Sequence, residues 1–235
     1  MALFGFLSRK AGPLDPKVAE QVYELAVAYV RDSDNRIHVE DLVSALAAAT
    51  GEACLRQVGQ VNIDDPASIP GSRVLSDAVN GALCADQTDW EKAPPETIYG
   101  IIHHYALVGG YAASAFPPMG EVFRTFIEGL AGETEWGWVP LSTPPANRPI
   151  VRPLQAAHDL RGPLEAIWTE HRVPPAYRAG VCALALAKAL AVVKEAIDPK
   201  IAVRTALETV NAMAKTVPVN EIHMRQMKAD AASGS

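Results

Sequence analysis

Apolar residues recur at helical spacing along most of this chain, and one stretch is apolar on nearly every side. Residues 179–197 consist mainly of alanine, leucine and valine, and they lie between Pro174-Pro175 and Asp198-Pro199. A helix that is hydrophobic all round has to be surrounded by other apolar elements. We therefore predict that 179–197 forms the buried central helix of an all-α fold.

The other periodic segments predict the helices that surround this central one. Asp15-Pro16 and Asp198-Pro199 are typical helix starts, because the aspartate caps free N–H groups and the proline fits the first turn. The predicted ranges are 16–31, 39–50 with a further turn or two over 52–58, 72–85, 96–115, 120–130, 154–171 and 199–216, with a stop or kink at Gly51 and at Gly162-Pro163. The pattern thus predicts a compact helical domain of about seven to nine helices around a buried central helix.

Residues 133–153 do not fit this helical pattern. They contain Trp136, Trp138 and five prolines, at positions 140, 144, 145, 149 and 153. This proline density favours an extended, polyproline-like path, and large aromatic rings normally pack against something. We therefore predict that this segment, which we call the strap, crosses the surface of the helical domain.

The strap also bears on the domain organisation. We predict an N-terminal segment over 1–14, a single helical domain over 15–217 and a polar C-terminal tail over 218–235. The alternative is two helical subdomains, 15–132 and 154–217, joined by the strap.

Composition limits which kinds of binding partner and which cellular compartment can be expected. The formal net charge is −6 and no stripe of lysine and arginine occurs, so no nucleic-acid partner is expected. Cys54, Cys84 and Cys182 have apolar neighbours, which predicts buried thiols and favours a cytoplasmic protein. No transmembrane segment is predicted, because the two longest apolar stretches also contain histidine, tyrosine or charged residues.

Two adjacent histidines suggest one site for a ligand. His103 and His104 point about 100° apart on a helix, so they do not form the pair of histidines that a helical metal site requires. Together with Tyr99, His158 and Glu165 they are candidates for a polar pocket between helices, and the alternative is that they are hydrogen-bonded core residues. No metal or cofactor is predicted.

Residues 32–42 carry alternating acidic residues between two predicted helices. Asp32, Asp34, Asn35 and Asp41 give the segment a partial resemblance to the latter part of an EF-hand calcium loop. The first ligand position, however, is occupied by Val30, and calcium sites normally close with a bidentate glutamate. We interpret the segment as a turn followed by a helix N-terminus, where acidic residues are favourable.

Aromatic and arginine side chains of the N-terminal segment and the strap suggest a second kind of site, although packing of the strap on its own domain explains the tryptophans equally well. Such residues are enriched where proteins bind one another, and the candidates here are Phe4, Phe6, Trp136, Trp138, Arg148 and Arg152. The first functional hypothesis is a non-enzymatic, soluble cytoplasmic protein that acts through contacts with a protein partner or through self-association. The alternative is an enzyme or ligand-binding protein with a pocket around His103 and His104. Weak contact between residues 1–10 and a membrane is a third hypothesis.

Overall fold

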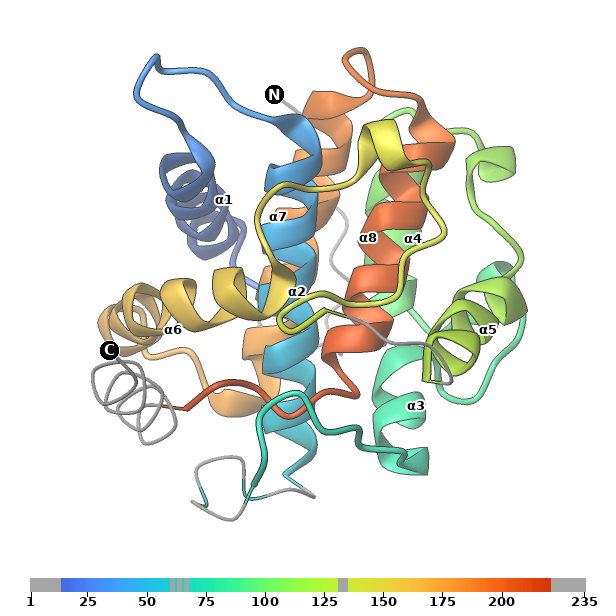
Figure 1. Ribbon diagram of the computed structural model, residues 1–235, viewed down its shortest axis with the longest axis horizontal. Helices are drawn as coiled ribbons and strands as arrows, with labels where there is room; N and C mark the ends of the chain where they lie inside the picture. The colour runs from blue at the N-terminus through green and yellow to red at the C-terminus, as the bar shows by residue number, and fades with distance from the viewer. Residues whose placement is uncertain (1–13, 60–61, 63–64, 66–67, 131–134, 221–235) are drawn as a thin grey trace.

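The computed structural model describes residues 14–59, 62, 65, 68–130 and 135–220, and these residues form an all-α fold (Figure 1). The described residues contain eight α-helices, three short 3-10 helices and no strand, which confirms the predicted fold class. The elements are α1 Pro16–Val30, α2 Val39–Val58, α3 Asp77–Cys84, η1 Trp90–Lys92, α4 Ile98–Val108, η2 Ala113–Ala115, α5 Met119–Leu130, η3 Pro145–Asn147, α6 Pro153–Glu170, α7 Pro175–Val193 and α8 Pro199–Met213.

The predicted central helix is α7, and its buried residues extend from Ala179 to Val193. It packs against α1, α2 and α4, and the larger of two apolar clusters joins residues from both halves of the chain. By length and composition α7 could cross a membrane, but 67% of that apolar stretch is buried inside the fold. The core helix of a globular protein has the same properties.

A second helix is as deeply buried as α7, and the sequence did not predict this. Helix α2 lies between α7 and α8, and nearly all of its residues from Glu40 to Leu55 are buried. The pattern did not reveal this because the helix carries Glu40, Asp41, Thr50 and Glu52 on faces that the fold encloses. Thr50 donates to Leu46 O within the helix, whereas the three carboxylates bind distant segments, as described below.

Two glycines allow close contacts between helices, one between α2 and α8 and the other between α4 and α7. Helix α2 continues through Gly51, where we expected a stop or kink. The glycine is instead required by the contact with α8, because a Cβ atom at this position would lie 2.6 Å from Met213 Cβ. Gly109 ends α4 beside α7, where an added Cβ would lie 2.8 Å from Ala191 Cβ. The next residue, Gly110, has φ +96°, so α4 stops at Val108 and does not reach residue 115.

The predicted helix starts are confirmed, and other boundaries differ. Asp15 caps Lys17 N at 2.9 Å, and Asp198 caps Lys200 N at 2.8 Å. Helix α7 begins four residues earlier than expected, because Pro175 fits the first turn, and α6 is continuous through Pro163.

The strap crosses the surface as predicted. In Figure 1 it is the yellow-green chain that runs from α5 along α8, turns at η3 and crosses α2 to reach α6. Between residue 135 and the start of α6 at Pro153, the only helical part of the described strap is the single turn at 145–147. Much of its backbone therefore needs hydrogen-bond partners outside the strap itself.

A buried lysine follows α8. Lys215 is 4% exposed, its ammonium group donates to Asn211 Oδ1 at 2.8 Å, and it lies 4.4 Å from the centre of the Phe123 ring. Burial lowers the pKa of Lys215 from 10.5 to about 8. The folded protein therefore binds this proton less tightly than the unfolded chain does.

We expect Gly51→Ala to lower the free energy of unfolding by about 1–3 kcal/mol, because the new methyl group would overlap α8. The control is Gly81→Ala in α3, where an added Cβ meets no atom within 4 Å and helix propensity favours alanine. Denaturant unfolding of both variants measures the difference. Equal stabilities of the Gly51→Ala and Gly81→Ala variants would contradict the close contact between α2 and α8.

We expect Lys215→Met to change how stability depends on pH. Between pH 8 and 10.5 the native lysine has lost its proton while the unfolded one keeps it, so wild-type stability rises with pH on account of this group. From pH 7 to pH 10 the variant should therefore lose about 2 kcal/mol of stability relative to wild type. Denaturant unfolding at several pH values measures this change, and a difference independent of pH would contradict the pKa shift.

Candidate functional site

A buried carboxylate on α8 holds one end of the strap. Glu208 is 1% exposed, and its oxygens accept hydrogen bonds from Ser142 N at 2.7 Å, Ser142 Oγ at 2.5 Å and Thr125 Oγ1 at 3.1 Å. A carboxylate is stable in a protein interior only when it is paired and hydrogen-bonded. Since Ser142 lies on the strap and Thr125 on α5, Glu208 joins three segments.

Arg204, one helical turn before Glu208, extends this connection. Its Nη1 lies 3.7 Å from Glu208 Oε1 and donates to Ser142 Oγ at 3.1 Å. Its Nη2 donates to Glu121 Oε2 on α5 at 3.0 Å. Helix α8 therefore presents one cation and one anion that together fix α5 and the strap.

The other end of the strap is held by the first turn of α2. Asp41 Oδ1 accepts hydrogen bonds from Ile150 N at 2.6 Å and Val151 N at 2.8 Å, and Asn147 Nδ2 donates to Glu40 Oε1 at 3.0 Å. Both acidic residues are buried. The extended backbone of the strap thus obtains acceptors that a sheet would otherwise supply.

A groove of about 680 Å³ lies between α5 and the strap. Thr125 and Ser142, which both bind Glu208, line opposite walls of this groove. Glu208 therefore sets the distance between the two walls. The lining residues are Thr125, Glu128, Gly129, Glu135, Trp138, Val139, Pro140, Leu141, Ser142, Arg148 and Pro149.

Two charged side chains in the groove are available to a partner. Glu128 on α5 and Arg148 on the strap are exposed, and neither side chain makes an ion pair or hydrogen bond with another residue that the structure describes. Glu135, in contrast, forms an ion pair with Arg152. The groove therefore combines apolar walls with one available anion and one available cation.

Several of the predicted interaction residues lie in or beside the groove. Trp138 and Arg148 line it, and Arg152 pairs with Glu135 at its edge. Trp136 lies on the strap beside Glu135 and is 39% exposed. Phe4 and Phe6, like the rest of residues 1–10, lie outside the described residues.

Tyr99, His103 and His104 all lie on α4, in mainly aromatic surroundings. Tyr99 is completely buried, and its hydroxyl donates to Leu207 O at 3.3 Å. The His103 ring packs edge-on against Phe116 with ring centres 4.7 Å apart, and burial lowers the pKa of His103. His104 is exposed beside Tyr105.

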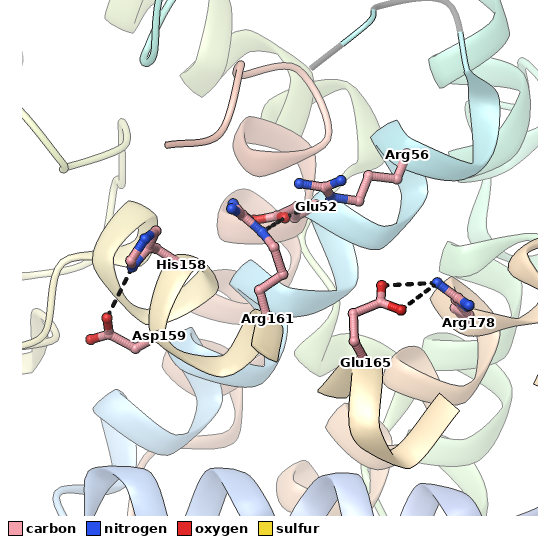
Figure 2. A network of polar contacts seen from close by, with 7 residues as sticks. All are labelled: Glu52, Arg56, His158, Asp159, Arg161, Glu165 and Arg178. Carbon is pink, nitrogen blue, oxygen red and sulfur yellow. Dashed lines mark hydrogen bonds and ion pairs between the residues drawn. The ribbon is translucent and has the colours of Figure 1, made fainter. Parts of the chain in front are cut away.

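His158 and Glu165 lie elsewhere, on α6. His158 Nδ1 is 3.1 Å from Asp159 Oδ1, and Glu165 binds Arg178 of α7 (Figure 2). In Figure 1, α4 and α6 lie on opposite sides of α2. The structure therefore places the five candidates for a polar pocket in two separate environments, three on α4 and two on α6.

The acidic segment before α2 is organised by its own residues. Asp32 Oδ1 accepts hydrogen bonds from Asp34 N at 2.9 Å and Arg36 N at 2.8 Å, and the Arg36 guanidinium group pairs with both aspartates. Asp41 binds the strap. Among the described residues, no group of three or more His, Cys, Asp or Glu side chains is arranged to hold a metal ion.

The three cysteines are buried, as the sequence predicted, and they form no disulfide. Burial raises the pKa of Cys54 and of Cys182 to about 12. Since the thiolate is the reactive form, these two thiols are not activated nucleophiles.

No protein-family model, curated protein or solved structure matches this chain. The site therefore has to be interpreted from its own geometry. Sequence reasoning missed Glu208 and Arg204, although a charged pair one turn apart on an apolar helix was a usable signal. It noted Glu40 and Asp41 only as favourable residues at a helix N-terminus.

We expect Glu208→Gln to lower the free energy of unfolding by about 2–4 kcal/mol, because an amide cannot accept all the hydrogen bonds that the carboxylate accepts. The matched control is Glu195→Gln, an exposed glutamate for which no ion pair is found among the described residues. Denaturant unfolding of the two variants tests this role. A loss no larger than that of the control would show that Glu208 does not hold the strap.

Proposed function

We propose that this protein is a non-enzymatic binding protein that holds an extended segment of a partner protein in the groove between α5 and the strap. The observation that carries the proposal is the groove itself, whose volume of about 680 Å³ is typical of binding sites. It is lined by tryptophan and arginine, which contribute strongly to binding energy at protein interfaces.

The lining of the groove indicates the chemistry of the partner. Trp138, Val139 and Leu141 offer apolar contacts, while Glu128 and Arg148 offer opposite charges. An occupant with apolar side chains flanked by one basic and one acidic residue matches this arrangement. An extended segment fits better than a globular surface, because the groove follows the extended strap.

Exposed apolar residues enlarge the surface around the groove. Ile127 and Leu130 on α5 are 54% and 38% exposed, and Ile150 on the strap is 71% exposed. Apolar side chains exposed on the two elements that form one groove favour a protein interaction surface.

The attachment of the strap supports binding in a second way. Glu208 and Asp41 fix the strap before any partner arrives, so little conformational entropy is lost at this wall when a segment binds. The buried free thiols support a reducing compartment, and we infer a cytoplasmic location from them.

The test is selection from a library of random peptides displayed on phage, followed by calorimetric titration of the enriched peptides. We expect enriched peptides to contain apolar residues and an acidic residue, and to bind Arg148→Glu about tenfold more weakly than wild type. Changing the acidic residue of the peptide to lysine should restore its binding to that variant.

The matched control is Arg124→Glu, which changes the charge of α5 at an exposed residue that does not line the groove. It should leave peptide binding unchanged. Peptides that bind wild type and Arg148→Glu equally well would contradict the proposal. A concentration-dependent dimer that Arg148→Glu abolishes in sedimentation would show instead that a second copy of this chain occupies the groove.

A further inference from the structure

Most of the side chains that remain available in the groove between α5 and the strap are hydrogen-bond donors. Trp138 lines the groove, its indole N–H makes no hydrogen bond to another described residue, and its nitrogen is not buried. Arg148 carries N–H groups and no acceptor, whereas Glu128 carries acceptors only. An occupant that supplies acceptors and few N–H groups of its own therefore suits this lining.

The ring of Trp138 is also available for packing. The residue is partly exposed, and among the described residues the aromatic contacts of tryptophan all involve Trp90. Pro140 and Pro149 line the groove beside it. Gly129 lets Pro140 pack directly on α5, since an added Cβ would overlap the proline ring. The indole therefore lies in a groove whose neighbouring walls are rigid and apolar.

A proline-rich segment has the properties that this lining requires. In the polyproline II conformation the chain is extended and forms no internal hydrogen bonds, so its carbonyl groups remain free to accept. Each proline also removes one backbone N–H, which lowers the need for acceptors in the site. Grooves lined by aromatic residues bind such segments in other proteins. A β-strand would instead present an N–H group at every residue.

The same donor and acceptor already meet elsewhere in this chain. The indole N–H of Trp90 donates to the carbonyl oxygen of Pro117 at 2.6 Å, and Pro118 follows directly. The Trp90 ring packs beside Phe116, with ring centres 5.6 Å apart. One tryptophan of this protein thus binds a proline carbonyl inside the fold, whereas Trp138 keeps the equivalent donor free in the groove.

We propose that the partner segment held in the groove is proline-rich and binds as a polyproline II helix. This assignment rests on the function proposed above and specifies the chemistry of the partner. Trp138 donates its indole N–H to a carbonyl of the segment, and a proline ring packs on the indole. Arg148 and Glu128 bind the acidic and basic residues that flank the prolines. Because the free segment is already extended, little conformational entropy is lost on binding.

The test uses peptides selected on the wild-type chain from the random phage library, titrated calorimetrically into two tryptophan variants. We expect the enriched peptides to be rich in proline. Trp138→Phe keeps an aromatic ring and removes the indole N–H, so these peptides should bind about tenfold more weakly. The matched control is Trp136→Phe, which changes a tryptophan of the strap that does not line the groove. It should bind like wild type.

A change in the peptide keeps the test decisive if Trp138→Phe alters the fold, which circular dichroism would show. Replacing the prolines of an enriched peptide one at a time by alanine should weaken binding to the wild-type chain about tenfold at one position or more. Enriched peptides that depend on Arg148 but contain no proline would overturn this inference and leave the proposed function standing. Alanine-substituted peptides that all bind like the parent, or equal binding by wild type and folded Trp138→Phe, would do the same. If no enriched peptide binds the wild-type chain, the proposed function itself is contradicted.

Discussion

The carboxylate of Glu208 is the interaction on which the surface architecture of this protein depends. A proline-rich strap cannot form an α-helix, and the described part of the chain offers no strand for it to pair with, so its N–H groups need acceptors from elsewhere. Glu208 supplies an acceptor from inside the helical core, and it binds Thr125 of α5 with the same carboxylate. One buried charge therefore fixes the strap, the neighbouring helix and the groove between them.

The same principle recurs around α2. This helix is enclosed by its neighbours, yet it carries Glu40, Asp41 and Glu52, each of which binds a segment more than one hundred positions further along the chain. Asp41 binds the strap and Glu52 binds α6. Burying a charge without partners is costly, so these contacts constrain which segments can lie against α2.

Buried carboxylates also position charged side chains nearer the surface. At the groove, buried carboxylates hold the walls and leave the exposed Glu128 and Arg148 available to a partner. Between α2 and α6, the buried Glu52 orients Arg161 through two hydrogen bonds. In both cases a charge inside the fold positions a charge at the surface.

The sequence by itself determined the helical fold and much of its detail. Residues 179–197 had to be enclosed because they are apolar on nearly every side, and Asp15-Pro16 and Asp198-Pro199 started helices because capping and proline geometry are local effects. The strap was predictable for the same reason, since proline restricts its own backbone. Trp138 and Arg148 were identified as candidates for interaction, but their shared groove was not.

Only the tertiary structure decided which polar residues act together. Helical periodicity gives the face on which a side chain lies and carries no information about which distant segment that face meets. Gly51 therefore looked like a helix stop, although it is the contact point for α8, and Glu208 gave no sign of its bond to Ser142. His103 and Glu165 looked equally suitable for one pocket, but α4 packs on α7 whereas α6 packs on α1 and α2, so the two side chains lie apart.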